Sequence, residues 1–178
     1  MPRLNTVTPE SAEGATKEIY DDLNSKMGKV INIFQGMGNS SAALKAYLAM
    51  SGALKQGDLT TEDREVIYLA ISELNGCQYC VSAHTVIAGG AGMSEEQILG
   101  ARKWAPVEEK HQALLKFTKR VIETKGHVED AEVEAVRAAG YSDGQIAETV
   151  AFIGLATYSN LFNHVYGTDL DFPAAPGI

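Results

Sequence analysis

Cysteine is scarce in this sequence, with only two thiols among 178 residues. Positive charge is also in short supply, because 15 Lys and Arg stand against 23 Asp and Glu, for a formal net charge of −8. This balance disfavours nucleic acid and anionic membranes as partners, since both bind through clustered basic residues. No window approaches about 18 uncharged apolar residues, so we expect no membrane-spanning segment and no membrane partner.

Sustained alternation of apolar and polar residues is absent as well, and apolar residues instead recur at helical spacing. The sequence therefore predicts an all-α fold of roughly eight helices. With 45% hydrophobic and 21% charged residues, the composition fits one globular domain, which we place at residues 1–178. No apolar stretch follows Arg3, so we expect no signal peptide and a cytoplasmic location.

Three helices can be located from their capping residues and apolar patterns. Thr60 is a suitable N-cap for a helix to about Leu74, which is apolar around most of its circumference and should be buried. Pro106 is expected to start another helix. Ser142 and Gln145 form a capping box that opens a long final helix. Its apolar side is predicted to consist of Ile146, Val150, Ile153, Leu155, Leu161 and Val165.

Both cysteines fall in one motif, Cys77-x-x-Cys80, with His84 four residues further on. Asn75-Gly76 reads as a break that makes Cys77 the start of a helix. Residues i and i+3 share a helix face, which puts the two thiols within disulfide reach, and a helix start favours the thiolate. His84 lies on the same face and can accept a thiol proton. The motif predicts a redox dithiol.

Glu65 on the preceding helix is a candidate acid beside His84, although its spacing alone equally fits a surface charge. Glu73 competes for the same role, but it lies near a helix C-terminus, where we expect exposure. Tyr79, between the cysteines, is interpreted as a packing residue. The remaining histidines have no motif context, and solvent or core roles are expected for His111, His127 and His164.

The arrangement Glu65-x11-Cys77-x-x-Cys80-x3-His84 in an all-helical chain resembles the AhpD-like alkylhydroperoxidases of the carboxymuconolactone decarboxylase superfamily. The resemblance covers most of the chain. Within the superfamily, the chain is similar to a branch of peroxidase-related proteins. The resemblance extends to Pro2-Arg3 with Glu18, to Asn39–Leu44, to Ser51–Leu54, and to the closing stretch from Phe162-Asn-His164 to Asp171-Phe-Pro173.

The resemblance implies an AhpD-like fold and a thiol-dependent peroxidase. By position, Cys80 would attack the peroxide, and a more accessible Cys77 would close the disulfide. His84 and Glu65 would form the proton relay. The family implies no bound cofactor or metal, but an external thiol reductant such as dihydrolipoamide or a thioredoxin-like protein. It also implies a homo-oligomer, a trimer or hexamer.

One departure from the family stands out, because its best-known members carry a histidine where this chain has Tyr79. Three alternatives stay open. A lactone decarboxylase would use acid–base residues without the cysteine pair. A zinc site would use Cys77, Cys80 and His84 with one distant histidine, although a second ligand pair is not apparent. A non-enzymatic redox sensor would form the disulfide without peroxide turnover.

Overall fold

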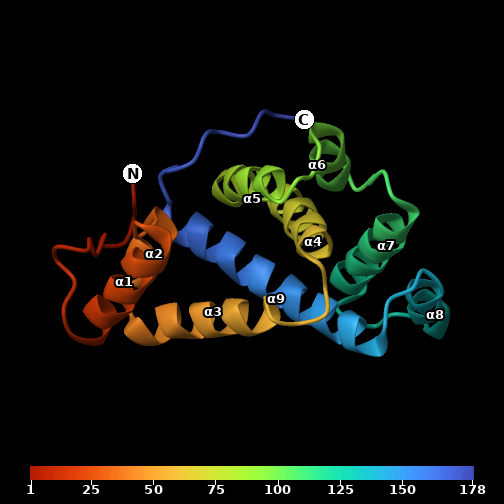
Figure 1. Cartoon of the computed structure of the whole chain (residues 1–178), viewed down its shortest axis with the longest axis horizontal. Coiled ribbons are helices and arrows are strands. Elements are labelled where there is room, and N and C mark those ends of the chain that lie inside the picture. The colour runs from red at the N-terminus through yellow and green to blue at the C-terminus, as the bar shows by residue number, and fades with distance from the viewer.

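The computed structural model describes residues 1–178 as nine α-helices without strands, so the all-α prediction is confirmed with one helix more than expected (Figure 1). No helix combines the length and apolarity needed to cross a bilayer. The helices are α1 (Gly14–Met27), α2 (Asn32–Met37), α3 (Ser41–Leu54), α4 (Thr61–Leu74), α5 (Gln78–Gly90), α6 (Glu95–Arg102), α7 (Glu109–Thr124), α8 (Asp130–Ala138) and α9 (Asp143–Tyr166).

Helix α4 is the centre of the molecule, as its apolar circumference predicts. Thr60 caps it by accepting from the Asp63 backbone N–H, while the Asp63 carboxylate accepts from the Thr60 backbone N–H. Ile67 and Ile71 pack into one hydrophobic cluster, with α7 and α9. Val66 and Leu69 pack into a second cluster, with α5 and α6. Because α4 is buried on both sides, it is firmly packed. Residues near its start are therefore well positioned to form part of a site.

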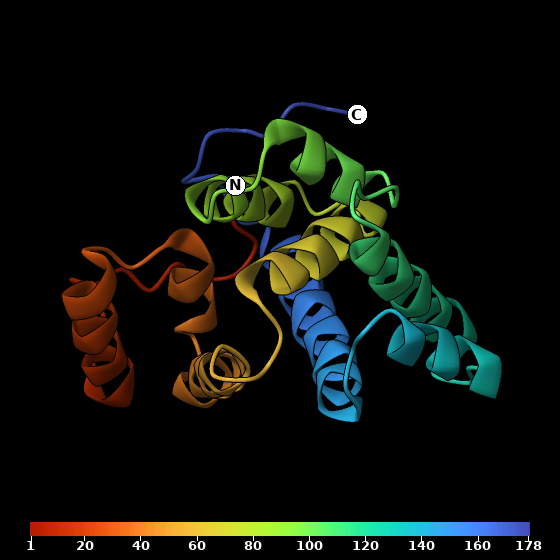
Figure 2. The ribbon, with the colours of Figure 1, turned by 45° about the vertical axis from the view of Figure 1, so that its right-hand side comes forward.

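The N-terminal helices form a separate wall. Figure 2 shows α1, α2 and α3 on one side, with α4, α5 and α9 on the other. A third hydrophobic cluster joins them and includes Phe34 of α2, Leu44 of α3 and both cysteines. The motif is therefore placed where the two halves of the chain meet.

Two details of the helices differ from the expectation. Helix α7 begins at Glu109, three residues after Pro106, because residues 107 and 108 form a bend. On α9, Val150, Leu161 and Val165 are exposed. The buried side is instead made of Thr149, Phe152, Leu155, Ala156, Ser159, Asn160, Asn163 and Tyr166. The predicted apolar side of α9 is therefore wrong in half of its members.

Candidate active site

The dithiol is formed by a tight break between α4 and α5. Gly76 adopts φ +65°, a left-handed conformation that favours glycine, and Cys77 follows as the N-cap of α5. The backbone N–H of Cys80 donates to Cys77 Sγ over 3.4 Å. The two Sγ atoms lie 2.8 Å apart as free thiols in hydrogen-bond contact. The break thus brings both sulfurs to one helix start.

The expectation that Cys77 is the more accessible cysteine is wrong. Cys77 is 1% exposed and Cys80 is 4% exposed. The C-terminal segment accounts for this burial, because it passes over the start of α5, where Gln78 donates to the Ala175 carbonyl (Figure 1). Only Cys80 lines the large cavity described below. Cys77 therefore lies behind Cys80 as seen from that cavity.

The two thiols share one strong electrostatic contact. The hydrogen bond between the two thiols lowers the pKa of Cys77, and the backbone N–H of Cys80 supports this shift. The same hydrogen bond raises the pKa of Cys80, and burial raises it further. The two thiols therefore differ in acidity although they lie in contact. Sequence reasoning from the helix start alone did not separate the two thiols.

Glu65 and His84 meet across the α4–α5 contact. Glu65 Oε2 lies 2.6 Å from His84 Nδ1, and Glu65 is 6% exposed. The imidazole ring stacks on Tyr68, with ring centroids 3.9 Å apart and planes 10° from parallel. The other ring nitrogen, Nε2, has no hydrogen-bond partner in the chain. Glu73, the competing acid, instead binds Arg102 Nε at 2.8 Å and points away from this pair.

A cavity of about 810 Å³ connects these groups. Its wall is mainly apolar and comes from α1–α5 and α9, with Leu23, Phe34, Leu48 and Phe152 among the lining residues. Cys80, Glu65 and His84 all line it. Two tyrosines add hydroxyl groups, and burial raises the pKa of Tyr47 to about 12 and that of Tyr68 well above its usual value. Both hydroxyls therefore stay neutral and can donate hydrogen bonds.

Two further residues lie close to the sulfurs, and the sequence analysis predicted the role of only one of them. Tyr79 packs as expected, edge-on against Phe172 with its hydroxyl 3.5 Å from the Ile33 backbone N–H. Asn163 of α9 was missed, and its side-chain N–H donates to Cys80 Sγ over 3.1 Å. The available signal was weak: an asparagine inside a helix, a residue type that helices disfavour unless its side chain finds a partner.

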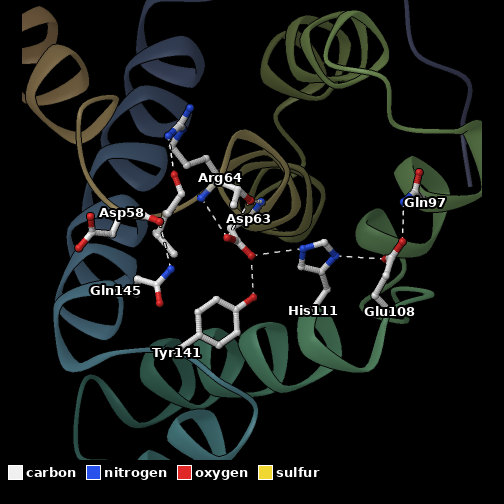
Figure 3. Close-up of polar contacts among 10 residues, drawn as sticks. Asp58, Asp63, Arg64, Gln97, Glu108, His111, Tyr141 and Gln145 are labelled. Atoms are coloured by element: carbon white, nitrogen blue, oxygen red, sulfur yellow. Dashed lines mark hydrogen bonds and ion pairs between the residues drawn. The ribbon is translucent and has the colours of Figure 1, made fainter.

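A second histidine–carboxylate pair lies at the start of α4 (Figure 3). His111 Nε2 is 3.3 Å from Asp63 Oδ1, which also accepts from the Tyr141 hydroxyl over 2.6 Å. Glu108 Oε2 contacts the other ring nitrogen at 3.1 Å. Hydrogen bonding to Asp63 raises the pKa of His111. Elsewhere too, no three His, Cys, Asp or Glu side chains are arranged to hold a metal ion.

Comparisons with known proteins agree with this architecture. The carboxymuconolactone decarboxylase family model matches residues 41–113, the span that contains α4 and the cysteine motif. An alkyl hydroperoxide reductase AhpD of Corynebacterium kroppenstedtii is 27% identical over 114 residues, which cover 58% of this chain and 64% of that protein. The curated relatives are matched over no more than 64% of their length.

Solved structures extend the likeness to nearly the whole chain. A peroxidase-related protein with an AhpD core from Ralstonia eutropha superposes with a TM-score of 0.85 at 24% identity, covering 96% of this chain and 92% of that one. The debrominase Bmp8, solved with 2,3,4-tribromopyrrole, gives a TM-score of 0.74 at 17% identity, covering 96% and 94%. At these identities the superpositions establish the fold.

Fold and motif together define a helical protein with a buried dithiol at a helix start. Over residues 41–113 the chain is similar to the carboxymuconolactone decarboxylase family, and its fold is that of the AhpD-core structures, as its sequence motif indicated.

Proposed function

We propose that this protein is a thiol-dependent peroxidase that reduces organic hydroperoxides through a Cys77–Cys80 dithiol/disulfide cycle. One observation carries the proposal: the cavity reaches Cys80 and the Glu65–His84 pair together, while Cys77 Sγ lies 2.8 Å from Cys80 Sγ. A peroxide in the cavity meets one sulfur, one imidazole and one carboxylate. The second sulfur is already within reach for the following step.

In the first step His84 takes the Cys80 proton, directly or through a water, and Cys80 attacks the terminal oxygen of the hydroperoxide. A sulfur–oxygen bond forms and the oxygen–oxygen bond breaks, so that sulfur gives up two electrons and becomes a sulfenic acid. The leaving alkoxide takes a proton from His84 and departs as an alcohol. Glu65, 2.6 Å from His84 Nδ1, orients the ring and stabilises its charged form.

In the second step Cys77 gives its proton to His84 and attacks the Cys80 sulfur. The disulfide forms, and the hydroxide released takes that proton and leaves as water. An external dithiol, such as dihydrolipoamide or a thioredoxin-like protein, then returns two electrons and two protons to the pair. We expect no bound cofactor to be required for this cycle.

The apolar wall of the cavity bears on the substrate class. A hydroperoxide with an alkyl or aryl body buries apolar surface against Leu23, Phe34 and Leu48, whereas hydrogen peroxide does not. We therefore expect a higher kcat/KM for cumene hydroperoxide than for hydrogen peroxide. This preference should come mainly from a lower KM.

The test measures peroxide consumption with a panel of reductants (dihydrolipoamide, thioredoxin and glutathione). Cys80→Ser should abolish consumption, because no sulfur then faces the cavity. Cys77→Ser should consume about one peroxide per chain and stop with a sulfenic acid, which dimedone traps. The exposed His127→Gln serves as a control and should match the wild type.

Three results would contradict the proposal. Equal behaviour of the two cysteine variants would contradict the assigned roles. Disulfide formation without sustained turnover under any reductant would indicate a redox sensor. Turnover of a lactone by Cys80→Ala, or of 2,3,4-tribromopyrrole with no hydroperoxide consumed, would indicate a different reaction.

A further inference from the structure

Asn163 donates a hydrogen bond to a sulfur of the cysteine motif from a different helix, α9. Its Nδ2 lies 3.1 Å from Cys80 Sγ, and the residue is 4% exposed and lines the cavity. The other buried asparagine of this helix face, Asn160, also works against the raised pKa of Cys80 through a hydrogen bond, but its amide donates to Ser72 and accepts from Asn75. Asn163 is thus aimed at the sulfur that meets the substrate.

The end of α9 fixes which face of the amide points to the sulfur. Gly167 ends the helix at φ +73°, and this left-handed turn folds Thr168 back over the last turn. The Thr168 hydroxyl then donates to Asn163 Oδ1 over 2.5 Å. Rotating the amide would place its oxygen against the sulfur lone pairs and would break this hydrogen bond. The N–H face therefore stays towards Cys80.

A thiolate at Cys80 requires a hydrogen-bond donor from the protein. Water has little access to its sulfur, and a buried thiolate without hydrogen-bond donors is costly. No lysine or arginine contacts the sulfur. The Tyr79 hydroxyl is turned away, towards Ile33. His84 Nδ1 is occupied by Glu65.

We propose that Asn163 is a catalytic residue that holds the negative charge on Cys80 Sγ, and that Thr168 is the positioning residue that orients its amide. When Cys80 loses its proton, the charge appears at the atom that Asn163 Nδ2 already touches. Hydrogen bonds to charged groups are stronger than those to neutral ones, so this contact strengthens as the thiolate forms. The N–H keeps its place while the sulfur–oxygen bond forms and the oxygen–oxygen bond breaks.

The proposal rests on the proposed peroxidase for its kinetic arm, but its first readout needs no peroxide. The reduced full-length protein is alkylated with iodoacetamide across a pH range, and modification of Cys80 is followed by mass spectrometry. Asn163→Ala should slow alkylation at pH 7 by about 10- to 100-fold and move its pH profile upward. Asn163→Asp should slow it further, because a second negative charge faces the sulfur.

Thr168→Val tests the positioning role, since it removes only the hydroxyl. It should shift the alkylation profile in the same direction by a smaller factor and leave the thermal unfolding midpoint nearly unchanged. The exposed neighbour His164→Ala is the matched control and should behave as the wild type. Turnover of cumene hydroperoxide by Asn163→Ala should fall through kcat, with KM nearly unchanged.

The outcomes separate the two proposals. An unshifted alkylation profile in both Asn163→Ala and Thr168→Val would overturn the role of Asn163, whatever the peroxidase assay gives. Lower thermal stability with an unshifted profile would overturn it too, by assigning a purely structural role. A shifted profile in a protein that consumes no peroxide would support Asn163 as the thiolate donor and would overturn the peroxidase instead.

Discussion

Helix α4 carries two carboxylates only two residues apart, and each pairs with a histidine. The two pairs differ in how many of their polar atoms have hydrogen-bond partners. Asp63 pairs with His111 of α7, and Glu65 pairs with His84 of α5. Both acids are buried. The chemical groups are nearly the same, so the difference between the pairs must come from their surroundings.

The pair at Asp63 is saturated (Figure 3). Its oxygens take hydrogen bonds from Thr60, Tyr141 and His111, and both nitrogens of His111 are occupied. The pair at Glu65 leaves His84 Nε2 without a partner, beside the cavity that holds Cys80. A histidine–carboxylate pair whose atoms are all satisfied can only stabilise the fold. A pair with one free nitrogen in the cavity that also reaches Cys80 is what the proposed proton relay requires.

The largest effect should come from breaking the open pair. Glu65→Gln and His84→Gln should each lower kcat/KM for cumene hydroperoxide by about 10²- to 10⁴-fold, because the leaving oxygen loses its proton donor. The free energy of unfolding should change by no more than about 1 kcal/mol, since a polar group of similar size remains. Steady-state kinetics and urea unfolding measure the two quantities. Wild-type turnover in both variants would mean that the relay does not exist.

Breaking the saturated pair should give the reverse pattern. Asp63→Asn should lower the free energy of unfolding by about 3 kcal/mol, because the buried His111 loses the carboxylate that compensates its charge. Activity per folded molecule should remain that of the wild type. Glu108→Gln, at the exposed end of the network, is the control and should cost about 0.5 kcal/mol. A fall in kcat/KM without loss of stability would make the network part of the reaction.

A smaller effect is expected when one donor to Asp63 is removed. Tyr141→Phe deletes the hydroxyl 2.6 Å from Asp63 Oδ1 and keeps the ring, which packs in the hydrophobic cluster. Urea unfolding should show a loss of about 1–1.5 kcal/mol. A neutral result would mean that water replaces the hydroxyl at Asp63.

The smallest effect should be a shallow pH dependence of stability. Hydrogen bonding to Asp63 raises the pKa of His111, so its stabilisation is complete below about pH 6.5, the unfolded pKa, and fades as pH rises through the folded value. Despite opposition from burial, hydrogen bonds from His111, Tyr141 and Thr60 lower the pKa of Asp63. Its contribution is therefore complete above about pH 3.9 and fades as pH falls through the lowered folded value.

The network should accordingly stabilise most between about pH 4 and pH 6.5. His111→Gln should flatten the alkaline decline, as measured by urea midpoints at a series of pH values. An unchanged decline would assign it to other groups.

Local sequence patterns were sufficient for the helices and the motif. The cap at Thr60 follows from residues three positions apart, and Cys77, Cys80 and His84 all belong to α5 or its N-cap. Local patterns could not predict the Asp63–His111 pair, because it joins residues 48 positions apart that carry no motif. The face of α9 was misjudged for another reason. Thr149, Ser159 and Asn163 are buried because their side chains find hydrogen bonds, which a count of apolar residues cannot register.

The C-terminal segment lies over the start of α5 and so bears on which reductants could reach the dithiol. Ala175 donates to Ser82 and its carbonyl accepts from Gln78, while Arg102 donates to the Pro176 carbonyl. These contacts close the outer approach to Cys77 and leave Cys80 open only through the cavity. We therefore expect small, flexible dithiols to regenerate the enzyme directly. A folded redox protein must first wait for the tail to lift, so its rate should saturate at the speed of that opening.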